Sequence, residues 1–303
     1  MAECHRLLLA AAIASLGACG SAGCAAVEKT VWSIGIYEGP GPLALTPAPG
    51  AANPVLAAAD VTDRAAAYVA DPFMVREGGT WYLFFEVASA RTGQGDIALA
   101  TSDDGLRWTY REVVLDEPFH LSYPCVFKCN GRYYMVPETR RTHAVRLYRA
   151  DRFPDRWSQV ATLLNGDYVD PTVLEHGGRW WMFASKGNGD LYLFWADRPE
   201  GPWTEHPKSP VVRGDPHRAR PGGRAVDLGE TVLRFAQDDF PTYGNQVRAF
   251  VITRLTTDDY QEHEAEGSPI LKASASRWNA RGMHQVDPHR TAEDRWIACV
   301  DGH

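Results

Sequence analysis

One position of a repeated sequence pattern recurs five times along this chain, and each time it carries a polar or charged side chain that could bind a ligand or transfer a proton. It is the residue before a proline in five related segments, occupied by Asp71, Tyr123, Asp170, Arg220 and Asp287. Acidic residues, Glu86 and Glu138, also end the apolar runs that follow the first two of these positions. Two carboxyl groups brought together in one site can act as a general acid and a general base, or as a proton donor and a nucleophile.

Each of the five positions opens a repeated pattern that reads as a hairpin. In the first copy, residues 68–86, an apolar run leads through a Gly-Gly turn into a second run that is apolar nearly throughout. Such runs on either side of a turn predict paired strands, the second buried on both faces. Residues 120–138 and 168–184 repeat the pattern, and two weaker copies follow. The copies begin roughly 50 to 70 residues apart, at or above the length of a β-propeller blade.

A second pair of β-like segments follows each hairpin, for example residues 96–102 and 108–115 after the first. Four strands per repeat, with more polar outer strands, form the blade of a propeller. The last repeat lacks its outer pair, and suitable strands lie at the other end of the chain, where residues 53–56 resemble residues 268–271. Strands from the N-terminal part would then complete the last blade and close the ring, which removes exposed sheet edges.

These patterns predict an all-β fold: a single five-bladed β-propeller over residues 28–303, with four-stranded blades. The chain has a net charge of −7, a pI of about 5.8 and no basic stripe, which argues against nucleic acid or an anionic membrane as its main partner. It carries no phosphate-binding glycine loop, serine nucleophile elbow or dinucleotide fingerprint. We expect a monomer without a cofactor.

Histidines gather around the last of the five positions. His284, Asp287 and His289 lie within six residues of sequence, and His120 opens the second repeat. Side chains of this kind could hold a cation, but their spacing is not diagnostic of a metal site and we expect no metal. Hydrogen bonding to a polar ligand is the alternative role for these histidines.

Residues 1–27 differ in composition from the rest of the chain. Leu7–Leu16 is an apolar run that is too short to span a bilayer. It fits the core of a bacterial signal peptide, and Cys19 stands where a lipoprotein cleavage box would place a lipid anchor. Arg6 is the only clear cation of the flank, so a disordered or misassigned start of a cytoplasmic protein is the alternative. We expect export, as a periplasmic protein or lipoprotein, in preference to a cytoplasmic location.

Six segments carry a resemblance to a known family: residues 32–39, 70–73, 120–124, 136–140, 236–238 and 296–302. The chain resembles the propeller-like N-terminal domain of glucosamine inositolphosphorylceramide transferases and its bacterial stand-alone relatives. More distantly, it resembles the five-bladed glycoside hydrolases of families 43 and 32. The resemblance implies a carbohydrate or glycoconjugate ligand. It does not extend to the glycosyltransferase module that follows this domain in the plant proteins, so transferase activity is not carried over.

The family 43 pattern implies roles for the carboxylates. Asp71 matches the first-blade aspartate that acts as general base or nucleophile, and Asp170 would match the aspartate that orients the site and tunes a neighbour's pKa. The acid would be a shielded glutamate, with Glu138 as first candidate and Glu86 as second. Tyr123 departs from the pattern, since an aspartate would suit the second blade. Aspartates that only cap turns and glutamates at solvated strand ends are the alternatives.

In a propeller the inner strands line the central channel, so their first residues can face its mouth. We therefore expect a substrate-binding set around the carboxylates, which comprises His120, Tyr123, Arg140, Lys186, Arg220, Gln237, Asp238, His284, Asp287 and His289. Two functions stay open at this point. One is a glycoside hydrolase or a related glycosyl-transferring enzyme, and the other is a non-catalytic glycan-binding or accessory module.

Overall fold

The computed structural model describes residues 31–292 and 294–303. The leader predicted over residues 1–27 lies outside these residues. Strands account for almost all regular structure in the described part, together with three short 3-10 helices: η1 (Ala58–Asp60), η2 (Arg140–Thr142) and η3 (Arg277–Asn279). No helix within the described residues is long and apolar enough to cross a membrane.

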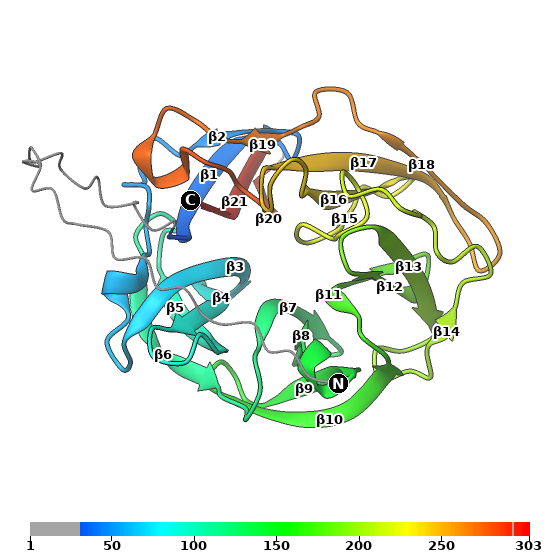
Figure 1. Cartoon of the computed structure of the whole chain (residues 1–303), viewed down its shortest axis with the longest axis horizontal. Coiled ribbons are helices and arrows are strands. Elements are labelled where there is room, and N and C mark those ends of the chain that lie inside the picture. The colour runs from blue at the N-terminus through cyan, green and yellow to red at the C-terminus, as the bar shows by residue number, and fades with distance from the viewer. Residues whose placement is uncertain (1–30, 293) are drawn as a thin grey trace, which may run out of the picture. The chain divides into compact units, whose positions relative to one another are not determined.

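The strands form five antiparallel sheets that are arranged as the blades of a ring (Figure 1). Blades are numbered along the chain, with the innermost strand of each given first. Blade 1 consists of β3 (Ala66–Glu77), β4 (Thr80–Ser89), β5 (Gly95–Ser102) and β6 (Thr109–Leu115); blade 2 of β7 (Ser122–Cys129), β8 (Arg132–Glu138), β9 (Ala144–Arg152) and β10 (Arg156–Asn165). Blade 3 consists of β11 (Val169–His176), β12 (Arg179–Lys186), β13 (Asp190–Ala196) and β14 (Thr204–Glu205).

Blade 4 consists of β15 (Val226–Asp227), β16 (Val232–Asp238), β17 (Gln246–Leu255) and β18 (Tyr260–Glu264), with the short β19 (Leu271–Lys272) also paired to β17; blade 5 consists of β20 (Val286–Ala292), β21 (Arg295–Gly302), β1 (Ser33–Gly41) and β2 (Ala44–Pro47). The all-β five-bladed propeller predicted from the sequence is therefore confirmed.

Blade 5 is built from both ends of the described chain. β1 lies between β21 and β2, with Ile34 opposite Asp301. Leu56, from the segment predicted to be an outer strand, forms a bridge with Ile34, just as Leu271 pairs with Val247 in blade 4. The predicted closure of the ring by N-terminal strands is confirmed, and it covers the edge of β21 that would otherwise be open.

A β-bulge occurs at the same place in three blades. The pairing of the two inner strands shifts by one residue beside Asp71, Tyr123 and Asp170. These residues have φ angles of 55°, 48° and 50°, in the left-handed region that asparagine and aspartate tolerate better than most residues. The proline that follows each has no N–H to offer the ladder, which suits a bulge at this point. The residue–proline repeat thus coincides with a bulge in blades 1 to 3, whereas Asp287–Pro288 in blade 5 pairs with β21 without a shift in register.

Apolar side chains of neighbouring blades pack together to form the core. β4 is buried on both faces from Leu83 to Ala88, as its lack of alternation predicts. Trp81, Trp180 and Trp181 are no more than 6% exposed, so these rings belong to the core. The packed blades leave the ends of their inner strands to form the walls of the channel.

Candidate functional site

Residues from blades 1, 2, 4 and 5 enclose a cavity of about 130 Å³ at one mouth of the ring. It is lined by Trp32, Tyr68, Ala70, Asp71, Glu86, His120, Ser122, Glu138, Arg220, Tyr243 and His284. Six of these are site residues predicted from the sequence: Asp71, Glu86, His120, Glu138, Arg220 and His284. Ring geometry therefore brings together carboxyl groups that lie far apart in the sequence.

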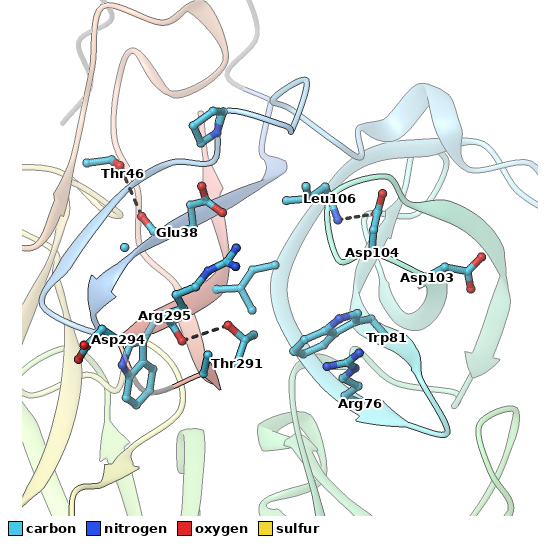
Figure 2. A pocket seen from close by; sticks show the side chains of 15 residues that line it. Glu38, Thr46, Arg76, Trp81, Asp103, Asp104, Leu106, Thr291, Asp294 and Arg295 are labelled. Atoms are coloured by element: carbon cyan, nitrogen blue, oxygen red, sulfur yellow. Dashed lines mark hydrogen bonds between the residues drawn. The ribbon is translucent and has the colours of Figure 1, made fainter.

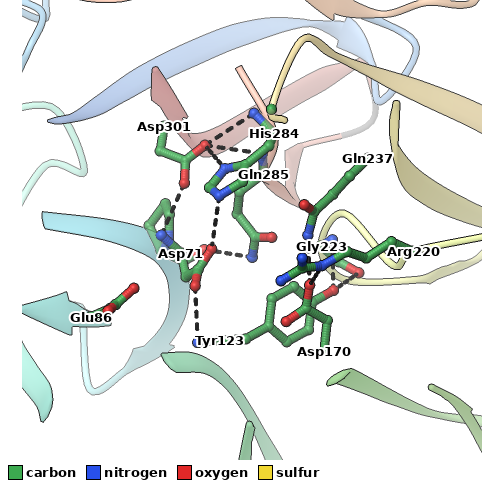
Figure 3. Close-up of polar contacts among 12 residues, drawn as sticks. Asp71, Glu86, Tyr123, Asp170, Arg220, Gly223, Gln237, His284, Gln285 and Asp301 are labelled. Atoms are coloured by element: carbon green, nitrogen blue, oxygen red, sulfur yellow. Dashed lines mark hydrogen bonds and ion pairs between the residues drawn. The ribbon is translucent and has the colours of Figure 1, made fainter. Parts of the chain in front are cut away.

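Asp71 lies between blade 2 and blade 5 (Figure 3). Its Oδ2 accepts the backbone N–H of Tyr123 at 3.2 Å, and its Oδ1 lies 3.5 Å from Nε2 of His284. The backbone N–H of Asp71 donates to Oδ2 of Asp301 at 2.9 Å. Burial raises the pKa of Asp71 to about 7, although the positive charge of His284 opposes the shift. Asp71 can therefore change protonation state close to neutral pH.

His284 is held by a buried carboxylate. Its Nδ1 lies 2.7 Å from Oδ1 of Asp301, which also accepts the backbone N–H groups of His284 and Gln285. Burial alone would lower the pKa of His284, but the carboxylates of Asp301 and Asp71 outweigh it and raise that pKa to about 9. The ring stacks on Trp32 at a centroid distance of 4.0 Å. An imidazolium ion thus faces Asp71 at neutral pH.

Asp170 lies behind the cavity and neutralises Arg220. Oδ2 of Asp170 accepts hydrogen bonds from Nε of Arg220 and from Nε2 of Gln237, both at 2.6 Å (Figure 3). The guanidinium group of Arg220 lies 5.2 Å from the ring centre of Tyr243. Asp170 itself is 1% exposed, so the position predicted to orient the site belongs to a buried polar network beside it.

Glu138 and Glu86 line the cavity with fewer partners. Oε2 of Glu138 is buried and has no hydrogen-bond partner among the described residues. Burial and then the charge of Asp170 raise the pKa of Glu138 to about 8. Oε1 of Glu86 accepts a hydrogen bond from the hydroxyl of Tyr68 at 3.1 Å and lies 3.6 Å from Nε2 of His120. Burial and then Asp71 hold the pKa of Glu86 well above its usual range.

Tyr123 does not lie on the cavity wall, contrary to the sequence prediction. It is fully buried, and its side chain crosses from blade 2 toward blades 3 and 4. The hydroxyl lies 2.7 Å from Oγ1 of Thr172 and accepts the backbone N–H of Gly223 at 2.7 Å. A tyrosine is long enough to make these contacts where an aspartate is not, so it ties three blades together.

Asp287 and His289 were also predicted at the mouth and do not line the cavity. Asp287 forms a buried ion pair with Arg224 and accepts the backbone N–H of Met74 at 2.5 Å. His289 places its Nε2 2.9 Å from Oδ2 of Asp287. Burial would raise the pKa of Asp287, but Arg224 and His289 hold it below its usual range. This carboxylate is used to join blades 1, 4 and 5.

Four further predicted residues lie outside the cavity lining. Gln237 contacts Asp170 from behind. Asp238 is fully buried and accepts hydrogen bonds from side chains of blade 4, including Nε of Arg248 at 2.8 Å. Lys186 is exposed, with its Nζ over the rings of two tyrosines. Arg140 is exposed on η2. Side chains at equivalent strand ends of the ring can point toward the channel or away from it. The position of a residue in the repeat does not show which of the two directions its side chain takes.

Several cavity residues were not predicted from the sequence: Trp32, Tyr68, Ser122 and Tyr243. Asp301, which ends a second strand of the repeat as Glu86 and Glu138 do, supports His284 from behind. Tyr68 is the one with a usable signal, since it lies on the same inner strand as Asp71 and three residues before it. Tyr243 belongs to the loop between β16 and β17, which is longer than the equivalent loops of blades 1 to 3.

The Asp71, His284 and Asp301 group is also the one that could offer atoms to a metal ion within the described residues. Its candidate ligand atoms lie within 4.8 Å of one another. Burial alone would lower the pKa of His284, but the carboxylates of Asp301 and Asp71 raise it to about 9, so a metal ion would have to displace a proton from this ring in order to bind there.

A larger groove, of about 520 Å³, lies between blades 5 and 1 (Figure 2). Arg76, Trp81, Asp104 and Arg295 are among the residues that line it. The guanidinium group of Arg76 lies 5.5 Å from the ring centre of Trp81. None of the site residues predicted from the sequence lines this groove, so the carboxylates point to the smaller cavity as the candidate site.

Comparison with known proteins identifies the family. Residues 24–303 match the family described as glucosamine inositolphosphorylceramide transferase 1, N-terminal. The chain belongs to this family. The transferase 1 protein of Oryza sativa subsp. japonica is 36% identical over 304 residues, which cover 92% of this chain and 41% of that protein. The Arabidopsis thaliana protein is 35% identical over 308 residues, which cover 93% of this chain and 40% of that protein.

The chain thus spans about two-fifths of the length of these curated relatives. The relatives are plant proteins, so the comparisons give no support to the bacterial origin and signal peptide expected from the sequence. The resemblance to this transferase family that the sequence motifs indicated is confirmed over the propeller.

Solved structures of glycoside hydrolases share the fold. The catalytic domain of a family 62 α-L-arabinofuranosidase from Coprinopsis cinerea matches with a TM-score of 0.61 at 14% identity, and covers 88% of this chain and 97% of its own. A mutant α-L-arabinanase of Cellvibrio cellulosa matches with a TM-score of 0.56 at 19% identity, over 76% of this chain and 85% of its own. At such identities the likeness shows the fold alone.

Proposed function

We propose that this propeller is carbohydrate-active: that it accepts one terminal sugar residue in the cavity and acts on its glycosidic bond as a glycoside hydrolase does. Membership of the family and the fold shared with glycoside hydrolases support a carbohydrate ligand. The cavity volume of about 130 Å³ is slightly less than the roughly 150 Å³ of a cavity that holds benzene, so the cavity can enclose only part of one sugar residue. A residue at a chain end therefore fits better than the interior of a polysaccharide.

The contrast between two carboxyl groups in one cavity is the observation that carries this proposal. Burial and Asp170 raise the pKa of Glu138 to about 8, so Glu138 holds a proton at neutral pH. Asp71 faces the imidazolium of His284, which opposes the effect of burial, so the pKa of Asp71 is about 7 and the carboxyl group is ionised in roughly half of the molecules at neutral pH. A protonated acid beside an ionised carboxylate is the pair that glycoside hydrolysis requires.

In the proposed reaction Glu138 gives its proton to the glycosidic oxygen as the bond between that oxygen and the anomeric carbon breaks. Asp71 either takes a proton from the attacking water or attacks the anomeric carbon itself, in which case water releases the sugar in a second step. Asp170, which stays bound to Arg220, keeps Glu138 protonated through its negative charge. Glu86 is the second candidate for the acid, because its pKa is raised as well.

An activity screen tests the proposal. The full chain is offered aryl glycosides and oligosaccharides with different terminal sugars, beside Asp71→Asn and Glu138→Gln. Turnover by the native chain and its loss in both variants are expected. Asp103→Asn is the matched control, because Asp103 is exposed in the groove between blades 5 and 1 and its loss leaves the cavity intact. Full activity in both cavity variants would disprove the assigned roles.

A non-catalytic glycan-binding module is the second candidate function. Asp71 favours it, because its Oδ2 already accepts the Tyr123 N–H and its Oδ1 faces His284, so that the carboxylate is fixed by the fold. In that case calorimetry would show that a terminal sugar binds in the cavity, and no substrate in the screen would be turned over. Loss of binding in Asp71→Asn would then mark the same cavity as the glycan site.

A further inference from the structure

The cavity leaves most of a substrate outside it. Its volume of about 130 Å³ encloses only part of one sugar residue, so a ligand whose terminal sugar enters it must continue across the mouth of the ring. The proposed reaction requires the same, because the glycosidic oxygen that Glu138 protonates joins the terminal sugar to the rest of the substrate. The side chains beside the cavity therefore decide what that rest can be.

One loop at this mouth is longer than its counterparts and carries two exposed aromatic rings. It comprises residues 239–245 and joins β16 to β17 in blade 4. The equivalent loops of blades 1 to 3 comprise only residues 90–94, 139–143 and 187–189. On the long loop, Phe240 is 56% exposed and Tyr243 is 45% exposed. Two of the five exposed large apolar side chains among the described residues thus lie on this one loop.

Hydrogen bonds hold the loop in one shape. The backbone N–H of Gly244 donates to Oδ1 of Asp239 at 2.9 Å, and Nδ2 of Asn245 donates to the carbonyl oxygen of Phe240 at 3.0 Å. Gly244 has a φ of 68°, and a Cβ at this position would lie 2.5 Å from the ring of Trp32, so the close approach requires glycine. The two exposed rings are therefore presented from a fixed backbone, which lowers the entropic cost of binding a ligand.

Tyr243 connects the loop to the cavity, which it lines together with Trp32. Its ring meets those of Trp32 and His284 nearly at right angles, at centroid distances of 6.2 Å and 5.4 Å. The hydroxyl of Tyr243 and Nε1 of Trp32 make no hydrogen bond within the part of the chain that the structure describes. Exposed ring surface and two polar atoms without a partner thus lie side by side at the mouth.

We propose that Tyr243 and Phe240 form a platform for a second sugar ring, the one that the reacting glycosidic bond joins to the terminal sugar. This rests on the proposed function, since it takes a terminal sugar to occupy the cavity. The C–H groups on the face of a sugar ring can pack on aromatic rings. Its hydroxyl groups can bond to the Tyr243 hydroxyl and to Nε1 of Trp32. The substrate class is therefore an oligosaccharide end of at least two sugars.

An apolar chain attached directly to the terminal sugar fits this mouth less well. Such a chain could also cover the rings of Tyr243 and Phe240, but it offers no donor or acceptor to the two polar atoms beside them. Polar atoms that lose their water on binding and gain no partner reduce affinity. A second sugar provides both the apolar face and the hydroxyl groups.

Calorimetric titration of the full chain with matched β-glycosides provides the test. Each set of probes shares one terminal sugar, which is followed by a methyl group, an octyl chain below its micelle concentration, or a second sugar. The sets are methyl glucoside, octyl glucoside and cellobiose; methyl galactoside, octyl galactoside and lactose; and methyl xyloside, octyl xyloside and xylobiose. In the set whose terminal sugar enters the cavity, the disaccharide should bind roughly threefold to tenfold more tightly than the other two probes, the range that an aromatic contact supplies.

Phe240→Ala separates the platform from the cavity. Phe240 lies outside the cavity lining, so this variant should bind the disaccharide little more tightly than the methyl glycoside. Phe240→Tyr keeps an aromatic ring and should keep most of the preference. Leu228→Ala is the matched control, because Leu228 is 47% exposed and lies in the turn before β16, at the other end of that strand. The control should show the full preference of the native chain.

Other outcomes would overturn the inference in distinguishable ways. Equal binding of the disaccharide and the methyl glycoside to the native chain would refute the platform and leave the proposed carbohydrate function standing. An undiminished preference in Phe240→Ala would refute it too. Tightest binding of the octyl glycoside would show that an apolar chain, and not a second sugar, covers the rings. Failure of every probe to bind would refute the platform and count against the carbohydrate function as well.

Discussion

Nε2 of His284 lies 3.5 Å from Oδ1 of Asp71, and this contact joins the last blade of the ring to the first. A second contact runs parallel to it, since the N–H of Asp71 donates to Oδ2 of Asp301 at 2.9 Å. Asp301 in turn lies on β21, opposite Ile34 of β1. The charge state of the candidate catalytic carboxylate therefore depends on the same strands that close the propeller.

Glu138→Gln should make the protein more stable at alkaline pH and leave it unchanged at acidic pH. The pKa of Glu138 is 4.5 before burial and about 8 in the fold. Between these values the folded protein holds a proton that the unfolded chain has released, so stability falls as the pH rises. Glutamine does not carry this penalty.

The melting temperature checks this prediction. The difference between variant and native protein should be near zero at pH 4.5 and should grow up to pH 8.5. Asp103→Asn is the control, with a small and pH-independent difference expected. If the difference in melting temperature between variant and native protein became smaller as the pH rose, Glu138 would instead be ionised and stabilised in the fold.

Tyr123→Phe should destabilise the fold without blocking the cavity. The tyrosine hydroxyl accepts the N–H of Gly223 at 2.7 Å and contacts Thr172. Its removal leaves a buried N–H without a partner, which costs about 1–3 kcal/mol. Chemical denaturation should show this loss while ligand affinity stays within a factor of two or so. A loss of ligand affinity with unchanged stability would instead support the substrate-binding role that the sequence predicted for Tyr123.

Asp170→Asn should cost stability, although the sequence pattern groups Asp170 with Asp71 as a functional carboxylate whose replacement spares the fold. In the structure Asp170 is 1% exposed and its Oδ2 accepts Nε of Arg220 at 2.6 Å. Loss of the charge leaves a buried guanidinium without its counter-ion, and such a change costs roughly 3–5 kcal/mol. We expect a fall in melting temperature for Asp170→Asn and none for Asp71→Asn, at pH 8. Equal melting temperatures of the three proteins would contradict the structural role of Asp170.

The repeats made much of the site predictable. Asp71, Glu86 and Glu138 could be placed at one channel mouth, because a propeller maps equivalent positions of each repeat onto the same axis. The bulge was not anticipated, yet in blades 1 to 3 its signal is present in the residue–proline pairs of the inner strands. Symmetry of the backbone is thus readable from a single sequence.

The contacts of equivalent side chains differ from blade to blade, and the repeats in the sequence do not predict them. Asp71 and Asp287 occupy equivalent positions, but Arg224 reaches Asp287 and converts it into a buried ion pair. The sequence gives no rule for pairing an arginine with an aspartate 63 positions later. Likewise Tyr243 enters the cavity from a loop that is longer than the equivalent loops of blades 1 to 3, so only the folded chain shows it.

Removal of the N-terminal strands should abolish both folding and the site. A chain that begins at residue 59 lacks β1 and β2, so β21 loses the partner strand that pairs with it along Ser33–Gly39. The edge of β21 would then be open, and Ile34 and Ile36, both fully buried, would be missing from the core. We expect no cooperative thermal transition from this truncated chain, whereas a chain that begins at residue 28 should melt like the full chain. Addition of a separate peptide of residues 28–58 should restore the transition and, with it, sugar binding in the cavity. A cooperative transition of the truncated chain without that peptide would show that the ring closes by another route.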